Sequence, residues 1–150
     1  MNVNATYPDA TGIQQLQAMI AAGKAAPIGD TLKFRLVEIA EGHAVFEAEP
    51  GLHAYNPIGS VHGGFAATML DSACGCAVHS RLGADKIHTT LELKIAYHRA
   101  ITAETGTIRA IGSVMTMGRR TAFAEGRIVD ANDRLLASAT STLLLMDRPA

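Results

Sequence analysis

One carboxylate stands alone in a long, otherwise apolar segment of this chain. Asp71 is the only formally charged residue between Gly63 and Ser80, where nearly every other residue is small or apolar. A carboxylate in such surroundings is costly unless it is paired, hydrogen-bonded or protonated. Groups of this kind serve as bases or nucleophiles at catalytic sites, although a buried Asp held by local hydrogen bonds is the structural alternative. The pattern indicates that Asp71 is a candidate general base or nucleophile.

Two adjacent glycines, Gly63 and Gly64, precede this carboxylate where a helix is expected to begin. The first N–H groups of a helix have no intrahelical acceptor, and they lie at the positive end of the helix dipole. Glycines there would let a ligand approach closely, which suits a carbonyl oxygen that gains negative charge in a transition state. A tight loop entry is the alternative interpretation of the same pair.

The spacing between these two features poses a geometric problem. Asp71 lies eight residues after Gly63, which separates them by about 12 Å along an uninterrupted helix. One chain could not easily bring both groups to a single scissile bond. A site shared between two copies of the chain, with the N–H from one and the carboxylate from the other, would remove the conflict.

The helix that carries Asp71 is expected to be the longest in the chain. It is predicted from Gly63 to about Arg81, because this stretch contains no proline. Its small and apolar residues lie on nearly every side, which is typical of a helix that is buried all round. A shorter amphipathic helix is predicted over residues 13–22 from its apolar spacing.

The rest of the chain alternates with the period of β-strands. Residues 32–40 and 44–49 are expected to form a hairpin around Glu41-Gly42. Further strands are predicted at about 89–98, 105–117, 120–130 and 134–146, the last two joined as a hairpin. Because no crossover helices separate them, the class is α+β rather than a doubly wound parallel sheet.

The domain organisation is expected to be simple. Residues 1–30 are predicted to form an N-terminal arm and a short helix, with residues 1–12 loosely held, and residues 31–150 to form the main domain. The chain shows no internal repeat and no linker that would indicate a second domain.

The amino-acid composition indicates which binding partners and which cellular location to expect. With 13 Lys and Arg against 14 Asp and Glu, neither nucleic acid nor a membrane surface is expected as a partner. A hydrophobic content of 48% argues against disorder and favours a homo-oligomer interface. Cys74 and Cys76 are too close for an easy disulfide and are interpreted as small core residues, so a cytoplasmic location is expected. The six His residues show no ligand spacing, and no metal site is expected.

The segment from Asn56 to Asp71 resembles the signature of the hotdog-fold thioesterases, specifically the phenylacetate-degradation (PaaI-like) acyl-CoA thioesterases. An Asn is followed six residues later by His62-Gly63-Gly64, and the Asp comes nine residues after that His. Weaker similarity extends over about residues 31–146. The resemblance implies a hotdog fold, in which a curled antiparallel sheet wraps around one long central helix. It also implies a dimer or dimer of dimers, commonly a homotetramer, that hydrolyses acyl-CoA without a cofactor.

The same resemblance assigns the reacting groups. It gives Asp71 the role of general base or nucleophile, and it has the Gly63 N–H polarise the thioester carbonyl across a dimer interface. Asn56, from the chain that supplies Gly63, would orient the water or the thioester. Thr90 is the best match for a residue that holds water, with Thr89 as its competitor.

Other motif residues receive weaker assignments. His62 either shapes the loop or takes part directly in catalysis, and Gly64 is assigned to substrate binding. Arg119 and Arg120 follow Gly118 at the start of a strand, where they would meet the phosphates of CoA or simply form a solvated strand end.

Two other functions are open at this point. A hotdog hydratase or dehydratase would pair an acidic residue with a His, and His62 and Asp71 are the candidates. A non-catalytic acyl-CoA-binding module is the other alternative. The acyl group stays open among aryl-acetyl, hydroxybenzoyl and aliphatic thioesters.

Overall fold

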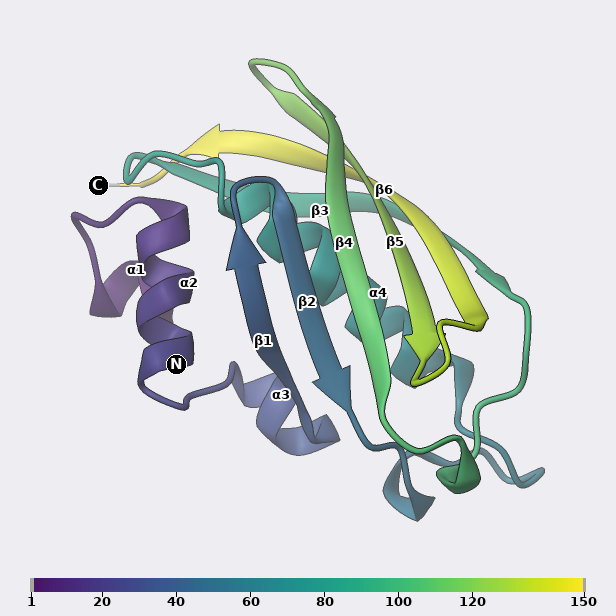
Figure 1. Ribbon diagram of the computed structural model, residues 1–150. Coiled ribbons are helices and arrows are strands. Elements are labelled where there is room, and N and C mark those ends of the chain that lie inside the picture. The colour runs from purple at the N-terminus through teal and green to yellow at the C-terminus, as the bar shows by residue number, and fades with distance from the viewer. Residues whose placement is uncertain (1, 150) are drawn as a thin grey trace.

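The computed structural model describes residues 2–149, and its elements follow the expected order of helix, hairpin, long helix and strands (Figure 1). The helices are α1 (Val3–Thr6), α2 (Gly12–Ala21), α3 (Pro27–Leu32) and α4 (Gly63–His79), with short 3-10 helices at Leu52–Ala54 and Ala103–Thr105. The strands are β1 (Phe34–Ala40), β2 (His43–Ala48), β3 (Lys86–Tyr97), β4 (Ile108–Met117), β5 (Thr121–Asp130) and β6 (Leu135–Asp147).

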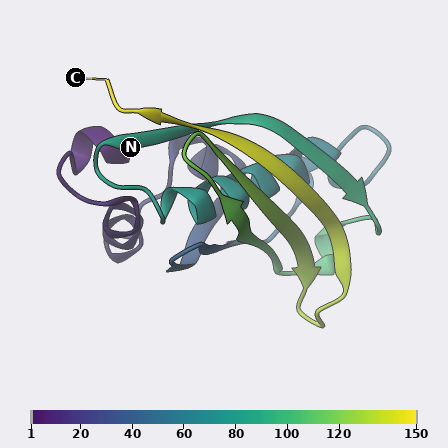
Figure 2. The same ribbon diagram turned by 90° about the horizontal axis from the view of Figure 1, so that it is seen from above.

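The six strands form one antiparallel sheet in the order β1-β2-β4-β5-β6-β3. Seen from above, the sheet curls around α4 (Figure 2). The β1–β2 hairpin turns at Gly42, whose φ of 74° favours glycine. The β5–β6 hairpin is present as expected. The α+β class and the hotdog arrangement are confirmed.

Two glycines let α4 lie directly against the sheet. A Cβ atom on Gly112 of β4 would lie 2.3 Å from the backbone of Ala73. One on Gly126 of β5 would meet the side chains of Leu70 and Cys74 at 3.0 and 3.1 Å. Leu70, Ala73 and Cys74 are fully buried as a result. Glycine in a strand often marks such a close approach.

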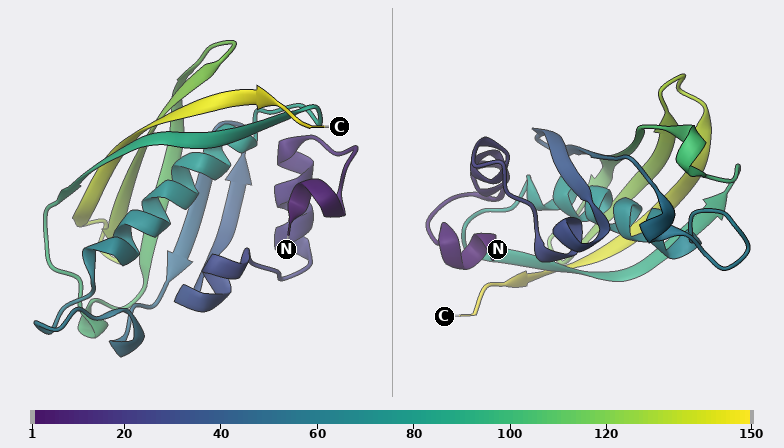
Figure 3. Two further views of the ribbon diagram at one scale, coloured as in Figure 1. Left: turned by 180° about the vertical axis from the view of Figure 1, so that it is seen from behind. Right: turned by 90° about the horizontal axis from the view of Figure 1, so that it is seen from below.

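The expectation that α4 is buried all round is wrong for one face of the helix. A stripe of residues three or four apart stays partly accessible, and it consists of Gly64, Ala67, Thr68, Asp71 and Ser72. From behind, α4 lies in front of the sheet on this side (Figure 3). Because these residues are small, their composition alone resembles that of a buried face.

The N-terminal arm is not loosely held over residues 2–12, which corrects the prediction there, and Met1 lies outside the described residues. Asn2 caps α1 through its side-chain oxygen, and Arg148 Nη1 donates to the Pro8 carbonyl at 2.8 Å. Gln15 Nε2 donates to the carbonyls of Tyr7 and Ala10 at 3.0 and 3.1 Å. The arm is therefore held by its backbone carbonyls, which accept hydrogen bonds from Gln15 and Arg148.

Helix α3 lies where only a connection was expected. Its start could have been recognised from Pro27 at the first helical turn and from Asp30 close behind it. Within residues 2–149, none of the helices is both long enough and apolar enough to cross a bilayer.

Candidate active site

The Asp71 carboxylate is held by a residue of edge strand β3. Thr90 Oγ1 donates a hydrogen bond of 2.8 Å to Asp71 Oδ1. The β3–β6 pairing shifts between Thr90 and Glu92, so Leu91 is an extra residue in the ladder. Bulges of this kind re-aim neighbouring side chains and are common beside active sites. Thr89 is exposed to solvent, so it is Thr90 that meets the carboxylate.

Asp71 lies on the wall of a cavity of about 330 Å³. One face of α4 supplies a row of lining residues, consisting of Asp71, Ser72, Gly75, Cys76 and His79. Strand β3 adds Ile87, His88 and Thr90. The remaining wall comes from the N-terminal arm and the β1–β2 hairpin. Its apolar residues include Leu16, Met19, Ile28, Phe34 and Phe46. Asp71 is the one carboxylate among the lining residues that the structure describes.

The cavity keeps its other titratable groups neutral. Burial, with a contribution from His88, lowers the pKa of His79 from 6.5 to about 4. Burial also lowers the pKa of His88. Burial and the nearby Asp71 charge raise the pKa of the Cys76 thiol to about 12. Since the thiolate is the reactive form of cysteine, Cys76 is not a nucleophile at neutral pH.

At the start of α4, Gly64 does not have the free N–H group that was expected, whereas Gly63 does. His62 is the N-cap, and its Nδ1 accepts a hydrogen bond of 2.8 Å from the Gly64 N–H. Gly64 therefore has no free N–H to offer a substrate. The Gly63 N–H has no acceptor within residues 2–149, and Tyr97 Oη donates to the Gly63 carbonyl at 2.9 Å.

Gly63 lines a second hollow of about 320 Å³, together with Val61, His62, Ala66 and residues 97–101. This hollow shares no lining residue with the Asp71 cavity. A single chain therefore brings Asp71 and Thr90 together but does not bring Gly63 to them.

Asn56 organises the loop that leads into α4. Its Oδ1 accepts from the N–H groups of Ile58 and Ser60 at 3.0 and 3.2 Å. Its Nδ2 donates to Ser60 Oγ at 2.9 Å. An amide carries two N–H donors, so one of them stays available for a ligand.

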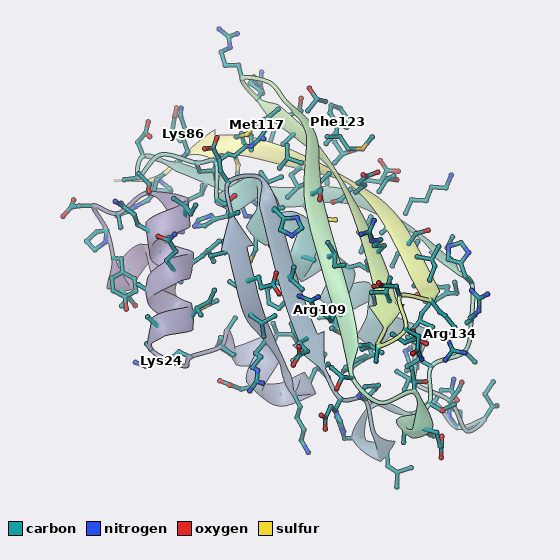
Figure 4. All side chains as sticks on the ribbon, in the orientation of Figure 1. Lys24, Lys86, Arg109, Met117, Phe123 and Arg134 are labelled. Carbon is teal, nitrogen blue, oxygen red and sulfur yellow. The ribbon has the colours of Figure 1, made fainter. Side chains whose placement is uncertain are left out.

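The two candidate phosphate-binding residues lie elsewhere. Arg119 and Arg120 are exposed at the tip of the β4–β5 hairpin, and neither lines the Asp71 cavity or the Gly63 hollow. Met117 and Phe123, which flank this turn, lie near the top of the view in Figure 4, and Lys24 lies at its lower left. In residues 2–149, no three His, Cys, Asp or Glu side chains gather closely enough to hold a metal ion.

Sequence reasoning missed most of the cavity wall. It did not single out the lining residues His79 and His88, and it treated the arm, whose Gln15 contacts His79, as separate from the site. The sequence did contain one signal that could have identified His79. It follows Asp71 and Gly75 at four-residue intervals, so all three share one helix face.

Residues 58–137, just over half of the chain, match the family model described as the thioesterase superfamily. The chain belongs to the thioesterase superfamily. Its thioesterase fold is shared with solved structures, among them a single-residue variant of the phenylacetic acid degradation protein PaaI from Thermus thermophilus. That match has a TM-score of 0.72 at 27% identity and covers 79% of this chain and 98% of the other. The E. coli PaaI protein from the phenylacetic acid degradation operon has a TM-score of 0.78 at 20% identity, covering 90% and 94% of the two chains, and shows likeness of fold.

A named CoA-thioester hydrolase resembles this thioesterase-superfamily chain in sequence. It is the 1,4-dihydroxy-2-naphthoyl-CoA hydrolase of Listeria monocytogenes serotype 1/2a (strain 10403S), 25% identical over 114 residues. The match covers 76% of this chain and 91% of that protein.

Proposed function

We propose that this protein hydrolyses acyl-CoA thioesters to the free acid and CoA, with Asp71 as the general base or nucleophile. One observation carries the proposal, namely a lone carboxylate on the wall of an apolar cavity, held by Thr90 Oγ1 at 2.8 Å. Membership of the thioesterase superfamily and the CoA-thioester hydrolase from Listeria support the same reaction.

In this mechanism the thioester carbonyl oxygen lies against the Gly63 N–H, which has no acceptor within residues 2–149. The N–H stabilises the negative charge that develops on this oxygen as the carbonyl carbon becomes tetrahedral. Asp71 either removes a proton from the attacking water or attacks the carbonyl carbon itself, forming a mixed anhydride that water hydrolyses to the free acid once CoA has left. The C–S bond then breaks and CoA leaves as a thiolate, which takes up a proton. The remaining amide N–H of Asn56 orients the water or the thioester.

The proposed site is completed by a second copy of the chain. The Gly63 hollow and the Asp71 cavity are separate in one chain, and α4 itself holds the two residues about 12 Å apart. The accessible stripe of α4 and the outer edge of β3 lie beside these groups. An antiparallel pairing of two β3 edges would continue the sheet and give a homodimer with two shared sites.

A hydratase built on a His62–Asp71 pair has less support. His62 Nδ1 is occupied by the Gly64 N–H, and His62 lines the Gly63 hollow rather than the Asp71 cavity. Crotonyl-CoA separates the two reactions, because hydration changes enoyl absorbance without releasing thiol. Hydration without thiol release would overturn the hydrolase proposal.

The experiment is a thiol-release assay over a panel of aromatic and aliphatic acyl-CoAs. Asp71→Asn is expected to lower kcat by roughly 10²–10⁴, the usual contribution of general base catalysis, and to leave the fold intact. Asp9→Asn changes an exposed carboxylate of the arm and is the matched control. Full activity in a folded Asp71→Asn protein would refute the assignment. A single turnover in isotope-labelled water then tests for direct attack. A first product with no label shows that Asp71 supplied one of its carboxylate oxygens, which happens when water opens the anhydride at the Asp71 carbon.

A further inference from the structure

The tyrosine at the end of edge strand β3 is bonded to the first residue of α4. Tyr97 Oη donates a hydrogen bond of 2.9 Å to the Gly63 carbonyl, from 34 positions further along the chain. Both residues line the Gly63 hollow. Tyr97 is 56% exposed in the single chain, so burial in the core does not explain an aromatic residue at this place. Its hydroxyl and its ring both contact the residue that carries the proposed oxyanion donor.

The tyrosine ring also explains why a glycine begins α4. A Cβ atom on Gly63 would lie 3.0 Å from Tyr97 Oη, 3.1 Å from Cζ and 3.3 Å from Cε1. These distances are shorter than ordinary van der Waals contacts, so the ring occupies the space that a side chain would need. The φ of Gly63 is not positive. Close packing against Tyr97, rather than backbone conformation, therefore accounts for the glycine.

A glycine at the start of a helix needs to be held if its N–H is to point in one direction. Glycine has more conformational freedom than other residues, and the first N–H groups of a helix have no intrahelical acceptor. His62 Nδ1 holds the Gly64 N–H, whereas the Gly63 N–H has no acceptor within residues 2–149. A carbonyl oxygen has two lone pairs, so the Gly63 carbonyl can accept from Tyr97 as well as within the helix. The tyrosine bond therefore fixes Gly63 from its carbonyl side and leaves its N–H free.

We propose that Tyr97 is a positioning residue, which holds the Gly63 N–H in the direction of the thioester carbonyl oxygen. The inference rests on the proposed thioesterase function and adds a residue that acts through Gly63. An oxyanion donor stabilises the transition state only when it points at the charge that develops there. Tyr97 belongs to the chain that supplies Gly63, so in a site shared between two copies its effect must follow that chain.

The first test removes the hydroxyl and keeps the ring. Tyr97→Phe is expected to lower kcat about three- to tenfold, the effect of one hydrogen bond, and to change KM little. Tyr55→Phe is the matched control, because Tyr55 Oη accepts a 2.8 Å hydrogen bond from the Ala103 N–H. Both variants lose one hydrogen bond to the backbone and should lose a similar few degrees of melting temperature. Only Tyr97→Phe should lose kcat, and equal kcat in the two variants would overturn the inference.

Hybrid oligomers show whether Tyr97 acts together with the Gly63 of its own chain. Gly63→Pro removes the N–H, so a hybrid of Asp71→Asn and Gly63→Pro chains takes the Gly63 of its intact site from the Asp71→Asn chain. Tyr97→Phe in that chain should lower the activity of the hybrid about three- to tenfold, and the same change in the Gly63→Pro chain should leave it unchanged. The two hybrids carry the same three substitutions, so a general loss of stability cannot distinguish them. Equal activity of the two hybrids would contradict the positioning role.

The motion of the Gly63 amide tests the inference without turnover. NMR relaxation gives an order parameter of about 0.85 for rigid backbone. We expect Gly63 to be rigid in the wild type and in Tyr55→Phe, and to have a clearly lower order parameter in Tyr97→Phe. If no thioester is hydrolysed, the proposed function fails, and this measurement alone decides the present point. An unchanged order parameter in Tyr97→Phe would overturn the inference, even beside a lower kcat, because the hydroxyl would then act on the substrate itself.

Discussion

Thr90 Oγ1 donates a 2.8 Å hydrogen bond to the Asp71 carboxylate, linking the edge strand of the sheet to the helix at its centre. This contact joins residues nineteen positions apart and fixes the direction of the carboxylate on the cavity wall. A base or nucleophile must be held in its reactive geometry, and the neighbouring hydroxyl serves that purpose.

Replacing the hydroxyl tests its positioning role. Thr90→Val keeps the shape of the side chain but removes the donor, and a hydrogen bond to a charged group contributes about 1.5–3 kcal/mol. We expect kcat to fall by roughly 10- to 100-fold, and the melting temperature to fall by several degrees because the same hydrogen bond stabilises the fold. Thr90→Ser restores the donor and should keep most of the activity. An unchanged kcat in Thr90→Val would show that the contact has no role in the reaction.

His62 is expected to act on the stability of α4 rather than on proton transfer. Its Nδ1 accepts from the Gly64 N–H, and loss of an N-cap costs about 1 kcal/mol. His62→Ala should therefore lower the melting temperature by about 2–4 °C, as a chain of this length responds. His62→Asn provides another good N-cap residue and should keep both stability and kcat. A large loss of kcat in stable His62→Asn would instead identify His62 as a catalytic group.

The packing of α4 on the sheet predicts unequal effects for two glycines. Gly112→Ala places a methyl group 2.3 Å from the backbone of Ala73, which cannot move without shifting the helix. We expect a loss of at least about 2–3 kcal/mol in the free energy of unfolding. The close contacts of Gly126→Ala are with the ends of two side chains, while the backbone oxygen of Ile111 is at an ordinary 3.6 Å, so it should cost about 1 kcal/mol. Urea denaturation measures both, and equal losses would contradict this account of the packing.

Much of this architecture could be predicted from the sequence. The proline-free stretch from Gly63 predicts α4, and alternating residues predict the strands. Thr90 could not be separated from Thr89, because the register of β3 depends on the bulge at Leu91, which has no sequence signature. The role of Gln15 was missed as well, because its partners are backbone carbonyls and a histidine 64 residues away.

The buried imidazole of His79 predicts a loss of stability in acid. Its pKa is about 4 in the folded chain and 6.5 ordinarily. As pH falls from 6.5 toward 4, the unfolded chain binds a proton that the folded chain does not, so the free energy of unfolding decreases. The full effect is on the order of 3 kcal/mol and is complete below the lower pKa.

Urea denaturation at about pH 7 and about pH 5 checks this pH dependence. His79→Gln should reduce it, because glutamine does not titrate, and the remainder comes from the buried His88, whose pKa is also lowered by burial. His98→Gln changes an exposed imidazole and should not. A pH dependence that is the same in all three proteins would rule out His79 as its source.

The site shared between two copies is the central claim, and hybrid oligomers test it most directly. Gly63→Pro removes the N–H of the first residue of α4. Proline is tolerated at this helical position, and the extended backbone of the preceding His62 also suits it. Losing one such donor should lower kcat by roughly 10²–10³, whereas Gly63→Ala keeps the N–H and should lose far less. Mixed oligomers of Gly63→Pro with Asp71→Asn would contain intact sites, formed from the Gly63 of one chain and the Asp71 of the other.

The measurement is thiol release by such a mixture after the two inactive proteins have been unfolded and refolded together. We expect about a quarter of the wild-type activity, the share of intact sites under random pairing of two chains. Differently tagged chains show that hybrids have formed. A mixture that contains hybrids but stays as inactive as its parents would contradict the shared site.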